Sequence, residues 1–361
     1  MTASATVISS CGQLVIGGFA GTTLPPAFRR ALADRRRGGV ILFKRNIDGE
    51  PARLAALTRD VHASAPETPL VGIDQEGGRV ARLRAPWLEL PPMRTVASWG
   101  DPALAQRIAH GVGVELAAMG ITITFAPVLD VNTCPRNPVI GDRAFGDDPA
   151  TVATFGAAWI RGLQSAGVLA CGKHFPGHGD TTKDSHVDLP VVDQPRERLD
   201  AVELVPFRAA VAGGVAALMT AHVVYPALDG DRPGTLSPAI ATRLRDAVGF
   251  RGVLFSDDLE MSAIAARGPV EDSAVQAVAA GCDALLICSS EELQERAVEA
   301  LVREAEASPA FRGRCEEASR RLLAARRRST ARPLDDDGIA RVVGGSDSAA
   351  LAREIAQRVA S

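Results

Sequence analysis

The feature that most restricts the fold of this chain is an alternation of short apolar runs with longer amphipathic segments. Eight runs rich in Val, Ile, Leu and Ala recur, and each is followed by a segment with helical periodicity. This order is typical of strands and helices that alternate around a parallel sheet. The expected strands span residues 13–19, 38–44, 69–74, 121–131, 168–175, 216–223, 252–258 and 282–288.

The number and spacing of these repeats favour a closed barrel over an open sheet. The first strand is not followed by a GxGxxG motif, which an open nucleotide-binding sheet would carry there. We therefore predict an α/β fold, a (β/α)8 TIM-type barrel in a single domain with a helical C-terminal extension. Residues 1–330 are expected to form the barrel domain and residues 331–361 a helical C-terminal cap. Helices are expected at residues 26–36, 51–63, 103–119, 151–166, 198–212, 239–247, 270–280, 290–328 and 339–360.

Composition argues against several classes of partner. The 40 basic and 43 acidic residues give a formal net charge of −3 and form no long block of one sign, so we expect no nucleic-acid partner. We find no export signal and no apolar run of about eighteen residues, so no membrane partner and a cytoplasmic location are expected. The six cysteines form no CxxC pair, which fits free thiols. The oligomeric state is not fixed by the sequence, and a monomer is the expectation.

Polar residues gather where the expected strands end. In a barrel of this kind, such residues lie together at one face, where the chemistry takes place. An aspartate at a strand end is more often a helix N-cap than a catalyst, and an arginine there is ordinarily a surface charge. The convergence of several such ends instead predicts a functional site. The residues concerned are Asp74, Arg79, Arg82, Asp130, Arg143, Lys173, His174, His222, Asp257 and Asp258.

The stretch KHFPGHGDTTKDSHVDLP, residues 173–190, holds three of the six histidines. His174, His178 and His186 are separated by a glycine-rich loop without the helical HExxH register of many zinc sites. Asp184 and His186 lie two residues apart, so the carboxylate can orient the imidazole and raise its basicity. The loop therefore fits proton transfer better than a metal cage. A metal-dependent amidohydrolase that also uses His222 remains an alternative.

These groups suit the hydrolysis of a neutral, hydroxyl-rich substrate. Glycoside hydrolysis needs one group to protonate the leaving oxygen and another to attack or stabilise the anomeric carbon. Asp257 can be the second group. His186, held by Asp184, can be the first near neutral pH, because the unperturbed pKa of histidine already lies close to it.

Four motifs carry a resemblance to a known family. IDQEGGRVARL, GDRAFG, KHFPGHGDTTKDSH and GVLFSDDLEM occur in this order. In residues 12–288 the chain closely resembles the family 3 glycoside hydrolases, and within them the single-domain β-N-acetylhexosaminidases of the NagZ type. The resemblance implies that Asp257 is the nucleophile, that His186 is the acid/base and that Asp184 is its partner. It also implies that the sugar hydroxyls and the 2-acetamido group are bound by Asp74, Arg82, Arg143, Lys173 and His174.

The resemblance implies a retaining exo-β-N-acetylglucosaminidase with no cofactor and no metal. Its expected substrates are small carbohydrates, peptidoglycan fragments of the GlcNAc-1,6-anhydro-MurNAc type, in cell-wall recycling. Asp258 is expected to act as an N-cap or as a hydrogen-bond partner behind the nucleophile. We expect Gly177 and Gly179 to give the acid/base loop the backbone freedom to close over substrate, and the empty loop to be partly disordered. The residues also leave open a β-glucosidase, an N-acetylglucosaminide phosphorylase and a non-catalytic sugar-binding protein.

Overall fold

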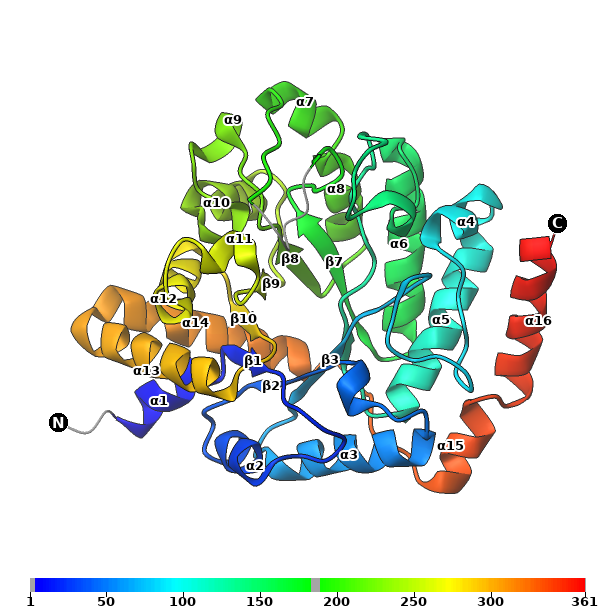
Figure 1. The fold of residues 1–361 in the computed structure, drawn as a ribbon, viewed down its shortest axis with the longest axis horizontal. Helices are drawn as coiled ribbons and strands as arrows, with labels where there is room; N and C mark the ends of the chain where they lie inside the picture. The colour runs from blue at the N-terminus through cyan, green and yellow to red at the C-terminus, as the bar shows by residue number, and fades with distance from the viewer. Residues whose placement is uncertain (1–3, 183–188, 361) are drawn as a thin grey trace.

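The computed structural model describes residues 4–182 and 189–360. Eight parallel strands close into a barrel in chain order, with the last strand paired to the first (Figure 1). The predicted (β/α)8 TIM-type barrel is confirmed. The strands are β1 (Val15–Gly17), β2 (Gly39–Leu42), β3 (Leu70–Ile73), β6 (Ile123–Thr124), β7 (Leu169–Phe175), β8 (Ala217–Thr220), β9 (Val253–Asp258) and β10 (Ala284–Ile287).

A ring of helices surrounds the barrel (Figure 1). Several of them begin where an Asp or Ser side chain accepts a hydrogen bond from a backbone N–H three residues later, as Asp101, Asp148, Ser237 and Ser290 do. Most also carry proline in the first turn, where its missing N–H costs no hydrogen bond. The helices that follow the successive strands are α2 (Pro26–Ala33), α3 (Pro51–Ser64), α5 (Pro102–Ala118), α6 (Pro149–Ser165), α8 (Leu204–Ala212), α10 (Pro238–Asp246), α12 (Val270–Ala280) and α13 (Glu291–Ala307).

Several shorter helices and strands lie outside the eight strand–helix repeats. Helix α1 (Ala5–Gly12) precedes the first strand. A two-stranded antiparallel hairpin, β4 (Gln75–Gly77) with β5 (Val80–Ala81), follows β3 directly. The other short pieces lie in loops after the strands: η1 (Lys44–Asn46), α4 (Met93–Ser98), η2 (Gly141–Arg143), α7 (Arg196–Ala201), α9 (Pro226–Asp229), η3 (Gly234–Leu236) and α11 (Ser262–Ala265).

The fourth barrel strand is shorter than expected. We predicted a strand over residues 121–131, but regular pairing in β6 covers Ile123 and Thr124 alone. Pro127 has no N–H to donate, so the ladder cannot continue in regular form. The chain still runs beside β7, because Ala126 and Pro127 accept hydrogen bonds from backbone N–H groups of that strand, at 3.0 and 3.1 Å.

Helix α14 (Pro309–Arg326) closes the amino-terminal end of the barrel. Leu322 and Ala325 pack into the cluster of side chains that fills the barrel interior, together with residues such as Phe125 and Phe255. Arg326 is buried and donates to the Gly38 carbonyl and to Gln13 Oε1, both at 2.6 Å. The carboxyl ends of the strands are therefore the open end of the barrel.

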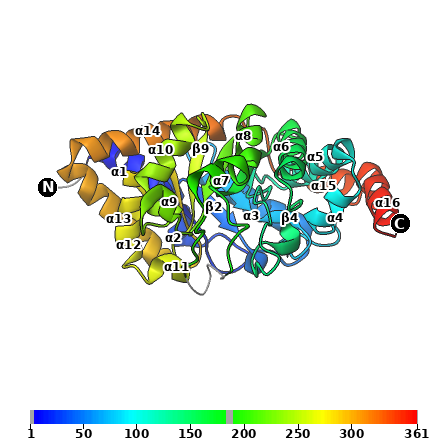
Figure 2. The same ribbon diagram turned by 90° about the horizontal axis from the view of Figure 1, so that it is seen from above.

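Two further helices lie outside the ring. Helices α15 (Asp336–Val342) and α16 (Ser346–Ala360) pack against α5. Glu115 of α5 accepts hydrogen bonds from the Leu88 N–H at 2.8 Å and the Ser348 hydroxyl at 2.7 Å, and so joins this layer to the barrel. Figures 1 and 2 place α16 at the edge of the molecule, with the two chain ends at opposite ends of its long axis. We propose that the boundary between barrel and cap lies at residue 330.

No helix within residues 4–182 and 189–360 combines the length and the apolar character that crossing a bilayer requires.

Candidate active site

A pocket of about 290 Å³ lies at the carboxyl ends of the strands. It gathers side chains from β3, the β4–β5 hairpin, the loop after β6, β7 and β9. The five predicted sugar ligands and the predicted nucleophile all line it, although they are far apart in the sequence. Its lining residues are Asp74, Glu76, Val80, Arg82, Val139, Arg143, Lys173, His174, His178 and Asp257.

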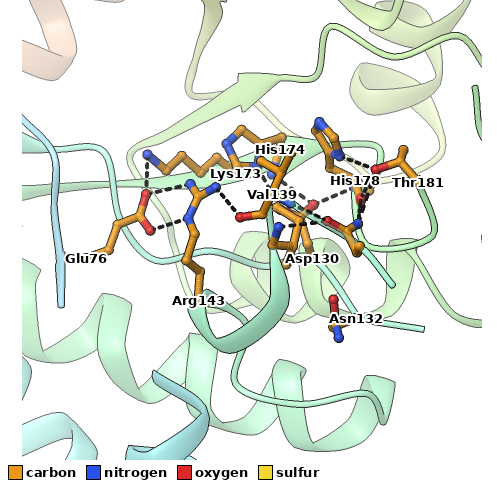
Figure 3. A network of polar contacts seen from close by, with 12 residues as sticks. Glu76, Asp130, Asn132, Val139, Arg143, Lys173, His174, His178 and Thr181 are labelled. Atoms are coloured by element: carbon orange, nitrogen blue, oxygen red, sulfur yellow. Dashed lines mark hydrogen bonds and ion pairs between the residues drawn. The ribbon is translucent and has the colours of Figure 1, made fainter. Parts of the chain in front are cut away.

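A network of alternating charges forms one side of the pocket. Lys173 Nζ lies 2.8 Å from Asp74 Oδ1 and 2.7 Å from Glu76 Oε1. The Arg143 guanidinium binds both oxygens of Glu76 at 2.8 Å, and Arg82 binds Asp74 Oδ2 at 2.9 Å. Figure 3 shows Lys173 and Arg143 meeting at the carboxylate of Glu76. Because each charge is held by an opposite one, the whole network has a fixed geometry.

These contacts keep the groups of the network charged. Burial alone would raise the pKa of Asp74, but the charges of Lys173 and Arg82 bring it below its usual value. The same balance places the pKa of Glu76 far below its usual range, because Arg143 and Lys173 outweigh its burial. Burial lowers the pKa of Lys173, yet Asp74 and Glu76 raise it more. Neither carboxylate can therefore act as a proton donor near neutral pH.

Asp130 is a buried carboxylate that organises the other side of the pocket. Its Oδ2 accepts a hydrogen bond from His174 Nδ1 at 2.7 Å, and its Oδ1 accepts from the backbone N–H groups of His174 and His178 at 3.2 and 2.7 Å (Figure 3). Burial raises the pKa of Asp130, but His174 brings it below the usual value. An ionised carboxylate only accepts, so the His174 proton sits on Nδ1 and leaves Nε2 available to a ligand.

Lys173 and His174 are consecutive residues of β7, and both line the pocket. Side chains of neighbouring residues in a regular strand point to opposite faces. Here the strand is irregular, because the register of β7 against β8 shifts between Gly172 and Phe175. The irregular strand end thus delivers a cation and an imidazole to the same pocket.

Asp257 is the second-to-last residue of β9, is half-buried and lines the pocket. Its Oδ1 accepts a hydrogen bond from the Asp258 N–H at 2.8 Å, and no other hydrogen bond to its carboxylate occurs within the described residues. Burial raises the pKa of Asp257, but the nearby charges of His222, His174 and Lys173 bring it below the usual value. The carboxylate is therefore ionised, with Oδ2 not engaged by the described part of the protein.

Asp258 has a different environment from its neighbour. Its Oδ1 accepts hydrogen bonds from the backbone N–H groups of Glu260 and Cys288, at 3.1 and 3.2 Å. Burial, followed by the negative charges of Glu260 and Asp257, raises its pKa to about 7. Asp258 does not line the pocket and is not the N-cap of α11, which is Met261. Of its two expected roles, the structure shows that of a hydrogen-bond partner of Asp257, the predicted nucleophile.

The two glycines at the start of the loop after β7 have a structural role that we did not expect. Gly177 has a φ of 134°, and its carbonyl accepts a hydrogen bond from the buried Tyr225 hydroxyl at 2.7 Å. A Cβ at Gly179 would lie 1.8 Å from the Val131 carbonyl oxygen. Backbone conformation and close packing thus demand glycine at these positions, whereas we had attributed both glycines to loop freedom. The expectation of a partly disordered empty loop falls on residues 183–188, outside the described residues.

The comparisons with known proteins identify the family. Residues 11–325 match the glycosyl hydrolase family 3 N terminal domain. The chain belongs to glycosyl hydrolase family 3. A curated beta-hexosaminidase of Thiobacillus denitrificans is 45% identical over 282 residues, which are 76% of this chain and 78% of that relative.

Solved structures of family 3 members agree with this assignment. A family 3 β-N-acetylglucosaminidase of a Paenibacillus species superposes with a TM-score of 0.87 at 39% identity, over 97% of this chain and 68% of that one. NagZ of Neisseria gonorrhoeae in complex with N-trifluoroacetyl-D-glucosamine gives a TM-score of 0.79 at 31% identity, over 96% and 97% of the two chains. The resemblance noted in the sequence is confirmed, and so is the prediction of an enzyme, a glycoside hydrolase of the β-N-acetylhexosaminidase type.

Sequence reasoning missed part of this family 3 site. Glu76 was not among the predicted ligands, although it lies two residues after Asp74, a spacing that places both on one side of an extended chain. Asp130 was noted at the rim without a role. His178 had no assigned role, and the structure buries it beside the pocket with its Nδ1 2.9 Å from Thr181 Oγ1. Burial lowers the pKa of His178 to about 4, so the ring is neutral.

Asp184 and His186 lie outside the described residues, so their roles stay predictions. Among residues 4–182 and 189–360, no group of three or more His, Cys, Asp and Glu side chains is arranged to hold a metal ion. The family assignment overturns the metal-dependent amidohydrolase as a class, because the chain is a glycoside hydrolase.

Proposed function

We propose that this protein is a retaining exo-β-N-acetylglucosaminidase that uses Asp257 as its nucleophile. One observation carries the proposal: an ionised carboxylate, whose Oδ2 accepts no hydrogen bond from residues 4–182 and 189–360, lies in a small pocket beside a fixed set of hydrogen-bonding groups. At about 290 Å³ the pocket is at the small end of ligand sites, which span roughly 300–1,000 Å³. A pocket of this size suits a single terminal sugar, and hence exo cleavage.

The charged network would bind that sugar. Carboxylates such as Asp74 accept hydrogen bonds from hydroxyl groups, while Arg82, Arg143 and Lys173 donate to hydroxyl and acetamido oxygens. His174 would add Nε2 as a further partner. Because Glu76 and Asp130 hold these side chains in place before substrate arrives, little ordering remains when the sugar binds.

The general acid would come from the loop after β7. Among the described residues, three carboxylates line the pocket: Asp74 and Glu76 are tied to cations, and the third is the proposed nucleophile. In our proposal His186, oriented by Asp184, supplies the proton. The order and spacing of the KHFPGHGDTTKDSH motif support this assignment, since its first residues are sugar-binding candidates in the pocket.

The reaction then has two steps. His186 donates a proton to the glycosidic oxygen while Asp257 Oδ2 attacks the anomeric carbon, so the carbon–oxygen bond to the leaving group breaks and a glycosyl ester forms. His186, now neutral, takes a proton from a water molecule that attacks the same carbon and releases Asp257. Two inversions give retention of configuration.

The proposed substrates are peptidoglycan fragments that carry terminal N-acetylglucosamine, of the GlcNAc-1,6-anhydro-MurNAc type, in cell-wall recycling. The names of the relatives support the N-acetylglucosaminyl part of this proposal. Hydrolysis of a chromogenic N-acetyl-β-glucosaminide, compared with the matching β-glucoside, tests the sugar preference. Adding phosphate and assaying for sugar 1-phosphate tests whether phosphate replaces water. The cytoplasmic location stays a prediction.

Replacing the nucleophile tests the mechanism. We expect Asp257→Ala to lower kcat by roughly 10⁴-fold or more, because the covalent step disappears. Asp147→Ala is the matched control, since that aspartate is exposed and only pairs with Arg94 on the surface. The measurement is turnover of the chromogenic N-acetyl-β-glucosaminide. An Asp257→Ala protein that keeps a tenth of the wild-type rate would refute the role of Asp257.

A further inference from the structure

We propose that His222 positions the nucleophile, acting through the backbone of Asp258. This inference rests on the proposed function, because it takes Asp257 as the attacking group. His222 is not among the residues that line the pocket, and the family-derived assignment gives it no role.

His222 lies just beyond the end of β8 and is 1% exposed. Its Nε2 is 2.9 Å from the backbone carbonyl oxygen of Asp258. A carbonyl oxygen only accepts hydrogen bonds, so Nε2 must carry a proton and donate it. The imidazole thus bridges β8 to the residue that directly follows the nucleophile on β9.

Two threonines fix the other side of the ring. His222 Nδ1 lies 2.7 Å from Thr235 Oγ1, and Thr235 Oγ1 lies 2.8 Å from Thr220 Oγ1. All three side chains are buried, with about 1% exposure each. These hydroxyls fix the orientation of the imidazole, because a buried ring that is hydrogen-bonded at both nitrogens has little freedom to rotate.

Asp258 transmits this restraint to the nucleophile. Its carboxylate is anchored by the N–H groups of Glu260 and Cys288, and its carbonyl by His222. Its own N–H donates to Asp257 Oδ1 at 2.8 Å. Because hydrogen bonds hold both the carboxylate and the carbonyl of Asp258, its N–H keeps Oδ1 of Asp257 in place. The direction in which Oδ2 of Asp257 points is thereby fixed as well. A tilt of Asp258 would swing Oδ2 away from the anomeric carbon.

His222 also affects the pKa of the Asp257 carboxylate. After the opposing effect of burial, His222 is the largest of the charges that lower the pKa of Asp257. Substitution by Asn or Gln can separate the geometric restraint from this electrostatic effect. Both side chains are uncharged, but the Asn amide replaces Nδ1 of the ring and the Gln amide replaces Nε2.

The test uses two variants of His222 that keep different hydrogen bonds. In His222→Gln the amide nitrogen takes the place of Nε2 and can still donate to the Asp258 carbonyl. In His222→Asn the amide nitrogen takes the place of Nδ1, so the contact with Thr235 stays and the bond to Asp258 is lost. His62→Asn is the matched control, because His62 Nε2 also contacts a backbone carbonyl, that of Gly120 at 2.8 Å, on α3 and outside the pocket.

We expect His222→Asn to lower kcat/KM for an aryl N-acetyl-β-glucosaminide by roughly 100-fold, as for a misplaced reacting group. The Kd for N-acetylglucosamine should stay within about threefold, because the groups that bind the sugar are unchanged. His222→Gln should lose less than about tenfold in kcat/KM, and His62→Asn should keep the wild-type value. A role limited to stability would instead lower kcat/KM equally in both His222 variants, or weaken sugar binding as well, and either result would overturn the proposal.

Trapping the intermediate separates this inference from the proposed function. A 5-fluoro N-acetylglucosaminyl fluoride should add one sugar to Asp257 in the wild type, detected by intact mass and peptide mapping. His222→Asn should label roughly 100-fold more slowly than the wild type, and His222→Gln less than about tenfold more slowly. If the wild type forms no ester on Asp257, the proposed function fails. If the wild type labels and the two variants label at equal rates, only the role of His222 fails.

Discussion

Individual residues of this site are held by partners that do not themselves react. Lys173 keeps its charge although it is buried, because Asp74 and Glu76 lie within 2.8 Å of its Nζ. Removing one partner from such a group leaves an uncompensated buried charge, which costs far more than the pair contributes. The site therefore depends as much on Glu76 and Asp130, which hold the ligands, as on the residues expected to touch the sugar.

The pH dependence of kcat/KM follows from the protonation states that the mechanism needs. Asp257 must be ionised, and its pKa lies below the usual value near 4, so the rate should fall on the acid side only below about pH 4. The proposed acid His186 must be protonated, so the rate should fall as the pH rises through a histidine pKa near about 6.5. Initial rates across this range measure both limbs, after preincubation at each pH to correct for unfolding. An acid limb at pH 5 to 6 would contradict the lowered pKa of Asp257.

The residues of the site differ in how well the sequence predicts them. Asp74, Lys173 and Asp257 were found because they end apolar runs and belong to family motifs. Glu76 was missed and Asp130 was given no role, because their importance lies in which side chains they hold, and such contacts join residues that are distant in the sequence. Glu76, for example, meets Arg143 67 residues later and Lys173 beyond that.

Elements of the fold position the site by departing from regular geometry. The irregular end of β7 turns Lys173 and His174 to the same side, and the short β6 leaves room for the loop that carries Asp130 and Arg143. The start of the loop after β7, which we call the loop stem, packs against the loop after β6 through Gly179, which lies close to the Val131 carbonyl. Patterns of apolar residues predict that a strand exists, but not where its regular geometry ends, because that point is set by packing against neighbours.

Substitution of Gly179 tests the packing of the loop stem. Gly179→Ala should lower kcat/KM by roughly 100-fold or more, because its Cβ would lie 1.8 Å from the Val131 carbonyl and must push the stem away. Gly313→Ala is the control: it lies inside α14 with no atom within 4 Å of its added Cβ, and should stabilise by about 0.5–1 kcal/mol. Steady-state kinetics and thermal melts report the two effects. An active Gly179→Ala protein would show that the stem tolerates displacement.

At the scale of the whole molecule, the barrel is closed in two ways, which we call its seam and its floor: the first strand pairs with the last, and a helix covers the amino-terminal end. The seam is the pairing of β1 with β10, and the floor is α14, which inserts Leu322 among the interior side chains. The sequence predicted the barrel well, since each strand carries its own apolar run. It indicated only helical character for residues 290–328, because a helix pattern does not show which surface the helix covers.

The contribution of the floor can be measured with neighbouring leucines. Leu322→Ala should lower the free energy of unfolding by about 2–5 kcal/mol, because it leaves a cavity under the barrel. Leu323→Ala, at the next and partly exposed position, should cost about 1 kcal/mol or less. Denaturant titration gives both values, and the activity of each folded protein should match the wild type. Equal losses for the two variants would show that α14 does not seal the barrel.

The position of α14 also bears on how the chain is made in the cell. Domains that fold during synthesis can begin only when the segments that complete their core have left the ribosome. Here β1 can pair with β10 only after residues 284–287 have been synthesised. The barrel interior is complete only after Leu322, near the end of the barrel sequence, has been added. A nascent chain that stops before residue 284 exposes both the unpaired edge of β1 and an open core, and one that stops before residue 309 still lacks α14. Late translational pauses are therefore the point at which this enzyme would most need a chaperone.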